Sequence, residues 1–189
     1  MSESRRTEIQ RRQVAAYARL LDAKCLEAAP DTIKVGAFYS PAFHQPCAIE
    51  VTLPRDGAGT VRVATFGTIS NFLIDSLGPE PPRVTPAFTL DARRRVTTDN
   101  VERLRDRLRE IDPWSLENHP AMGLDGIDCY GRVVGSARTP RDFLAFMPWQ
   151  AGARRHAEFF DLVLEVALAE IREPETQIVL KGVERYRRT

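Results

Sequence analysis

The sequence lacks the features that mark membrane and secreted proteins. No apolar run approaches the ~20 residues that a membrane-spanning helix needs. The charged amino-terminal stretch has no apolar core behind it, so we expect no secretory signal. The three cysteines lie far apart without paired spacing, which argues against a disulfide framework or a zinc knuckle. We therefore expect a cytoplasmic protein with no membrane partner.

The short motifs of the common enzyme classes are missing as well. The chain contains no phosphate-binding loop ending in Gly-Lys-Ser/Thr, and no GxGxxG, GxSxG, HExxH or EF-hand loop. Only three histidines are present, and none lies beside another metal ligand at a suitable spacing. We assign no catalytic residue and expect no metal and no cofactor.

The chain has no large excess of charge of either sign. Its 27 basic and 26 acidic residues give a net charge of +1, so no overall field attracts it to DNA, RNA or an anionic membrane. Only three of the basic residues are lysine, an arginine bias typical of a GC-rich bacterial genome. Nucleic acid is therefore not the partner that we expect.

The composition is that of a folded globular protein. With 189 residues, of which 43% are hydrophobic and 28% are charged, the chain suits one domain that buries about 70% of its unfolded surface. We predict a single domain over residues 1–189. The stiff connector PEPP suggests one minor joint within it, at residues 78–83.

The most apolar long segment is His156–Arg172. It places eight large apolar side chains within thirteen positions, and on a helix its polar side chains form one narrow strip. This pattern predicts a strongly apolar helix near the carboxyl end, around which the core assembles. Further helices are predicted over Thr7–Ala29, over Gly67–Gly78 and over Asp99–Ile111, the last with a narrow apolar stripe.

Short alternating runs between these helices predict strands. The clearest pair is Cys47–Leu53 with Thr60–Phe66, joined by an Asp-Gly turn. Residues 143–147 are ambiguous: Thr139-Pro140 could start a helix, but a hairpin is favoured. Other predicted strands are Thr32–Tyr39, Arg83–Leu90 (at an edge or bulge, because of Pro86), Leu124–Val134, Phe143–Met147 and Gln177–Val183.

The order of these elements predicts an α+β fold. We expect a mainly antiparallel sheet of hairpins, because no helical crossovers separate most of the strands. The sheet should pack against an N-terminal helix, a middle helix and the strongly apolar C-terminal helix.

The best local candidate for chemistry is the segment from Asp125 to Tyr130. Its carboxylates Asp125 and Asp128 fit an acid/base pair or a cation site, and His156 is a further candidate. The structural explanation is stronger, because Asp-Gly is turn chemistry and Cys129 shares a strand face with apolar residues. A small hydrolase is therefore the alternative function.

Arginines and loop aromatics are the candidate partner contacts. Arg93-Arg94-Arg95, predicted at a turn, is the one uninterrupted basic run of three and suits a phosphate or an acidic surface. Aromatic rings in loops are typical anchors of protein interfaces, although the tryptophans could instead cover the ends of the core. The candidate binding residues are Arg93, Arg94, Arg95, Phe43, His44, Trp114 and Trp149.

These observations favour a non-catalytic protein-binding module. The class that fits is a bacterial protein of immunity, inhibitor or adaptor type, whose partner is another protein such as a toxin or a secreted effector. Arginine-mediated nucleic-acid binding is a second alternative, and a steep salt dependence would be its signature.

Overall fold

The structure of the protein is a computed structural model. It describes residues 29–67, 88–119, 126–150 and 152–187. It also describes Glu8, Arg12 and residues 15–17, and these five residues are helical. Apart from Ala29 and Gly67, which are described and are not helical, the rest of the predicted helix Thr7–Ala29, the predicted helix Gly67–Gly78 and the candidate joint at 78–83 lie outside these residues.

Six strands form one antiparallel sheet in the order β4-β3-β2-β1-β5-β6. The predicted α+β class is confirmed, and so are the β2–β3 hairpin and the β5–β6 hairpin, which was favoured over a helix. Among the described residues β4 is an edge strand with a register shift opposite Thr65 and Phe66, whereas Pro86, on which the expected edge or bulge rested, lies outside them. The strands are β1 Ile33–Pro41, β2 Cys47–Leu53, β3 Gly59–Phe66, β4 Phe88–Val96, β5 Ile127–Gly135 and β6 Arg138–Phe146.

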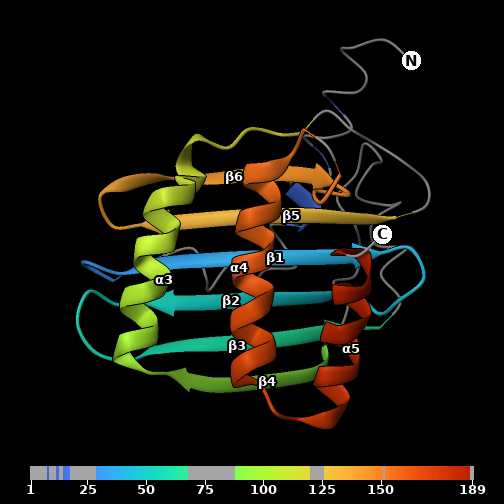
Figure 1. The fold of residues 1–189 in the computed structure, drawn as a ribbon, viewed down its shortest axis with the longest axis horizontal. Coiled ribbons are helices and arrows are strands. Elements are labelled where there is room, and N and C mark those ends of the chain that lie inside the picture. Colours follow the sequence, from blue (N-terminus) through green and yellow to red (C-terminus); the bar gives the residue numbers. More distant parts are fainter. Residues whose placement is uncertain are drawn as a thin grey trace.

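Three helices, α3 Thr98–Ile111, α4 Arg154–Glu170 and α5 Pro174–Glu184, lie on one face of this sheet (Figure 1). We call it the helix face. Short 3-10 turns follow α3 at Pro113–Ser115 and α5 at Arg185–Arg187. None of the helices in the described ranges is both long and apolar enough to cross a membrane.

The helix face holds the main core, and α4 is central to it. α4 crosses the strands in the middle of the sheet (Figure 1). It buries Phe159, Phe160, Val163, Leu164 and Ala167, as expected for the most apolar helix. The Tyr39 hydroxyl of β1 donates a buried hydrogen bond of 2.7 Å to the Phe160 carbonyl. This bond ties the helix to the centre of the sheet.

α3 packs beside α4 through its predicted stripe of Val101, Leu104, Leu108 and Ile111. Side chains join the two helices at both ends. The Arg155 guanidinium donates to the Ile111 carbonyl at 2.6 Å, and the Asn100 amide donates to Glu170 at 3.1 Å. Arg155 therefore satisfies a carbonyl at the end of α3 that would otherwise lack a partner.

The prediction of a last strand over Gln177–Val183 is wrong, because this segment belongs to helix α5. Pro174 occupies the first turn, where its missing N–H costs nothing. Thr176, Val179, Leu180 and Val183 are buried at helical spacing. A run of seven residues was too short for the sequence pattern alone to separate a strand from a helix.

The predicted turn at Arg93–Arg95 is also wrong, because these residues lie within β4. The described strand runs from Phe88 to Val96, beyond the predicted end at Leu90. Ala92 and Val96 are buried on the helix face, while the three arginines are exposed. The apolar alternation of β4 is weak, which is why a basic run in this strand looked like a turn.

The opposite face of the sheet divides into two halves. The strand register and the alternation of side chains define these halves. The half near the C-terminal residues of β1 is apolar, and the half near its N-terminal residues is polar. The apolar half holds Tyr17, Phe38, Ala48, Phe66, Tyr130 and Leu144. The polar half holds Lys34, Glu50, Thr52, Thr60, Arg62 and Arg132.

Candidate functional site

The β4 strand is the more open of the two edges of the sheet. It pairs with β3 on one side, and no backbone hydrogen bond from any described residue reaches its other side. Most of its side chains are exposed, Phe88 to 44%. An edge of this kind presents a row of backbone donors and acceptors to an incoming strand.

The arginines of β4 differ in their partners. Arg94 points to the helix face and forms an ion pair with Glu173 at the start of α5. Arg93 and Arg95 point to the opposite face, and no ion pair joins either of them to another described residue. Two exposed guanidinium groups therefore remain available on one side of the strand.

A neighbouring acid on β4 is already neutralised. Asp91 accepts two hydrogen bonds from Arg62 of β3, at 2.8 and 2.9 Å, and these bonds lower the pKa of its carboxyl. Arg62 also lies 3.5 Å from Glu50 of β2. Arg93 also lowers the pKa of Asp91 through its charge, without an ion pair, so Arg93 and Arg95 are the guanidinium groups of this edge that no described carboxylate binds directly.

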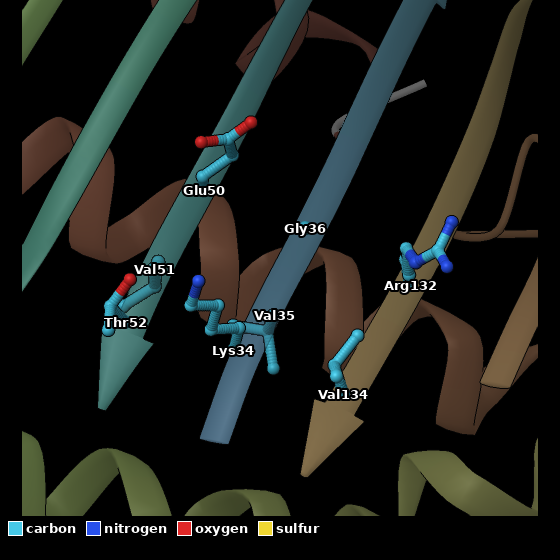
Figure 2. Close-up of a pocket in the computed structure, with 8 residues that line it drawn as sticks. All are labelled: Lys34, Val35, Gly36, Glu50, Val51, Thr52, Arg132 and Val134. Atoms are coloured by element: carbon cyan, nitrogen blue, oxygen red, sulfur yellow. The ribbon is translucent and has the colours of Figure 1, made fainter. Parts of the chain in front are cut away.

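The polar half has a charged row that spans the full width of the sheet. In register order the row is Arg93, Arg62, Glu50, Gly36, Arg132 and Asp142. Its glycine leaves a hollow of about 20 Å³ beside Glu50 and Arg132, shown in Figure 2. That volume has room for a single water molecule and is far below the ~300 Å³ of a small ligand pocket. The hollow is therefore no substrate site.

The other edge, β6, is covered by the chain itself. The segment that follows the 3-10 turn lies along it, and the Leu144 N–H donates to the Asn118 side chain at 2.9 Å. The Leu144 carbonyl accepts from the His119 N–H at 2.7 Å, and Arg141 donates to the Leu116 carbonyl. The β6 edge thus offers a partner fewer free backbone groups.

The remaining predicted binding residues lie at opposite ends of the sheet. Phe43 is 75% exposed in the β1–β2 loop, and the neighbouring His44 ring lies edge-on to Tyr186, with Nδ1 3.3 Å from its hydroxyl. Trp149 lies beyond β6 at this same end and donates a 2.7 Å hydrogen bond to Asp161. Trp114 lies at the opposite end, beside Gly135. The structure therefore does not gather these side chains into one surface.

Both tryptophans pack against the main core and are only partly exposed. Arg138 stacks on the Trp114 ring, with 4.6 Å between the guanidinium carbon and the ring centre. This arrangement matches the structural alternative considered above, in which the tryptophans cover the ends of the core.

The residues considered for catalysis do not meet. Asp128 projects to the face opposite the helices, where burial raises the pKa of its carboxyl to about 6 and a hydrogen bond from Tyr17 opposes that rise. His156 lies at the start of α4 on the helix face, where burial lowers its pKa. The sheet separates the two side chains, and Asp125 lies outside the described residues.

Cys129 is fully buried with Ile127 and Val133, as predicted for a packed thiol. Burial raises its pKa well above the ordinary value, which keeps the thiol protonated and unreactive. Among the residues that the structure describes, no group of three or more His, Cys, Asp or Glu side chains could hold a metal ion.

Sequence reasoning missed the charged row across the sheet. One signal was available, because Glu50 and Arg62 occupy outward positions in the two strands of the predicted β2–β3 hairpin. Opposite charges at facing positions of a hairpin predict a cross-strand pair. Predicting the pairs Arg62–Asp91 and Arg132–Asp142 requires the register of β4 and β6, for which the sequence contains no local signal.

Comparison with known proteins does not add a function. No protein-family model matches the chain, and no curated protein is similar to it. The functional argument therefore rests on the geometry of the site.

Proposed function

We propose that this chain is a protein-binding module that receives an extended, acidic segment of a partner protein along the β4 edge. One observation carries the proposal. β4 is the edge without a second strand among the described residues, and it presents Arg93 and Arg95 without ion pairs. A partner strand would supply both the missing backbone bonds and the missing negative charges.

The two contributions have separate physical roles. Backbone hydrogen bonds to an added strand supply affinity regardless of sequence, and side chains at every second position supply specificity. Carboxylates in the added strand, opposite Arg93 and Arg95, would form charge-assisted hydrogen bonds with the guanidinium groups. The exposed Phe88 ring at the start of β4 adds an apolar contact for the end of the same segment.

Charged side chains on an edge strand have another known role, which is to prevent aggregation by edge-to-edge pairing. The two roles differ in their dependence on the sign of the charge. An edge that is only protected tolerates glutamate in place of arginine, whereas an edge that binds an acidic segment does not.

The test uses two fluorescently labelled peptides of alternating pattern, one with glutamate and one with lysine between valines. We expect the glutamate peptide to bind, and the double variant Arg93→Glu/Arg95→Glu to weaken its binding tenfold or more, about 1.4 kcal/mol or greater. The matched control is Arg103→Glu/Arg107→Glu, which makes the same change of net charge on the exposed side of α3. Fluorescence anisotropy gives the dissociation constants.

Three results would contradict the proposal. They are equal affinity for the lysine peptide, an equal loss in the α3 control, and unaltered binding in the β4 variant. A DNA duplex is included as a further probe. Tighter binding to the duplex than to the glutamate peptide would instead support the nucleic-acid alternative.

An immunity, inhibitor or adaptor role follows from this proposal as the class of protein to examine first. The absence of the common catalytic motifs and the separation of Asp128 from His156 support it. A stable stoichiometric complex with a toxin or secreted effector, lost in the β4 variant and kept in the α3 control, is the expected result.

A further inference from the structure

A groove of about 640 Å³ lies between the last turns of α3 and the β5–β6 turn. The segments that line it, the end of α3 and the β5–β6 turn, lie at the end of the sheet where β1 begins, on the left in Figure 1. This volume is within the 300–1,000 Å³ of small-molecule sites and far above that of the hollow at Gly36. The site is separate from the β4 edge, because two strands, β3 and β2, lie between β4 and β1 in the sheet order.

The groove has an apolar lining from three elements. Leu108 of α3, Ile33 at the start of β1 and the Trp114 ring all line it. Trp114 is held in place by its packing against the core and by the absence of a side chain at Gly135, where an added Cβ would lie 3.2 Å from the ring. A preformed apolar surface of this kind suits the hydrocarbon part of a ligand.

Guanidinium groups face the groove from two sides. Arg105 and Arg109 are one helical turn apart on α3, and Arg138 is the first residue of β6. Arg105 is fixed by a 3.0 Å hydrogen bond to the Leu53 carbonyl. Arg109 and Arg138 are largely exposed, although Arg109 forms an ion pair with Asp106 on its own helix. Asp31 and Asp112 also line the groove, so with Asp106 the three positive charges are matched by three negative ones, and the exposed N–H groups of Arg109 and Arg138 remain as donors.

One donor in the lining has no acceptor among the described residues. The Trp114 indole N–H is shielded from solvent, and none of those residues accepts a hydrogen bond from it. Leaving such a donor unsatisfied is unfavourable. Arg138, which covers part of this ring, is held to Asp112 by a long contact of 3.8 Å. This contact is weak enough for a ligand anion to compete with it.

We propose that this groove binds a small organic anion, with an apolar body on Ile33 and Trp114 and a carboxylate or phosphate between Arg109 and Arg138. The anionic group forms charge-assisted hydrogen bonds with the two guanidinium groups. It also brings an acceptor close to the Trp114 ring, whose N–H has no partner among the described residues. This site is independent of the β4 edge and of its partner.

The chain provides its own reporter for the test. Trp114 and Trp149 are its two tryptophans, so Trp149→Phe leaves Trp114 as the single indole, at the groove. The probes are benzoate and phenyl phosphate, which combine a ring with an anion. Benzylamine has the same ring with the opposite charge, and acetate and inorganic phosphate lack the ring. Each probe is titrated at constant ionic strength while Trp114 fluorescence is followed.

We expect a saturable fluorescence change with benzoate or phenyl phosphate and a weaker one, by tenfold or more, with benzylamine. The ring-free anions should also bind more weakly. In the same background, Arg109→Gln should shift the midpoint for the ring-bearing anions to higher concentration by threefold or more. Arg109 is largely exposed, so its loss leaves the fold intact. Arg103→Gln, on α3 outside the groove lining, is the control and should leave the midpoint unchanged.

The proposal is overturned if neither ring-bearing anion gives a saturable change, or if benzylamine binds as tightly as benzoate. Equal midpoints in the Arg109→Gln and Arg103→Gln variants also overturn it. A preference for benzoate over phenyl phosphate, or the reverse, identifies which anionic group the site accepts.

Discussion

The two edge strands of the sheet, β6 and β4, differ in how far other described residues of the chain bond to them. At β6, the segment after α3 lies along the strand, and Leu144 has partners for both its N–H and its carbonyl. β6 also contains Pro140, a residue that natural proteins use on edge strands because it removes a backbone donor. At β4, the described residues supply no such cover, and the outward side chains are arginines.

The cover at β6 is short, because the Asn118 side-chain amide and the His119 N–H bond only the two backbone groups of Leu144. No described residue bonds the β4 edge in this way, and the proposed partner strand is our explanation for this difference.

The substitution Leu164→Asp should unfold the sheet, so that neither edge strand is formed. Leu164 is fully buried on α4, where a carboxylate would have no partner and the leucine packing would be lost. We expect the free energy of unfolding to fall by more than about 4 kcal/mol, which would be observed as the absence of soluble folded protein. Ala169→Asp, on the exposed side of the same helix, is the control and should stay soluble. A folded Leu164→Asp variant would show that α4 is not the centre of the core.

The carboxylates near the two edges should respond to pH in opposite directions. Asp128 of β5 has its pKa raised to about 6 by burial, whereas Asp91 of β4 has its pKa lowered by Arg62. From pH 4 to 6 the folded chain therefore keeps a proton on Asp128 that the unfolded chain has lost. The free energy of unfolding should fall over this range by roughly 2–3 kcal/mol relative to Asp128→Asn.

For Asp91 the sign is reversed. Its contribution is present above the unfolded pKa of about 3.9 and is lost as the pH falls below it. The effect relative to Asp91→Asn should be small, because the carboxyl is half exposed. Urea unfolding of the three proteins from pH 3 to 7 checks both signs. A wild-type curve parallel to that of Asp128→Asn would contradict the buried state of Asp128.

Asn118→Ala should partly open the β6 edge. The variant leaves the Leu144 N–H without its acceptor, at a cost of about 1 kcal/mol. Urea unfolding measures the loss, and size-exclusion chromatography shows whether an opened edge associates with other molecules. Glu117→Ala, at the neighbouring exposed position, controls for the side-chain change. Equal stability of the two variants would show that Asn118 does not cover the edge.

Much of the fold could be predicted because hydrophobic alternation is local. The hairpin of β2 and β3, the stripe of α3 and the apolar α4 all follow from patterns within one element. The boundaries of β4 and the helical nature of α5 could not be predicted in this way. Arginines interrupt the alternation of β4, and the short apolar run of α5 fits both periods.

The candidate sites were less accessible to sequence reasoning for a physical reason. Arg93, Arg94 and Arg95 were recognised as a basic run, but their role depends on β4 being an edge, which is a property of the whole sheet order. The groove joins α3 with residues near positions 31 and 138, and no local pattern relates these segments. Contacts between segments far apart in the sequence require the register and the packing to be known.

Amide hydrogen exchange, resolved by residue with NMR, can show whether a partner strand adds to β4. In the free chain, the Leu144 amide should exchange slowly because it is bonded to Asn118, and the outward amides of β4 should exchange faster. Adding the glutamate peptide at saturation should slow exchange along β4 between Phe88 and Val96 and leave Leu144 unchanged. Peptide binding without new protection on β4, or with protection at β6 instead, would contradict the account.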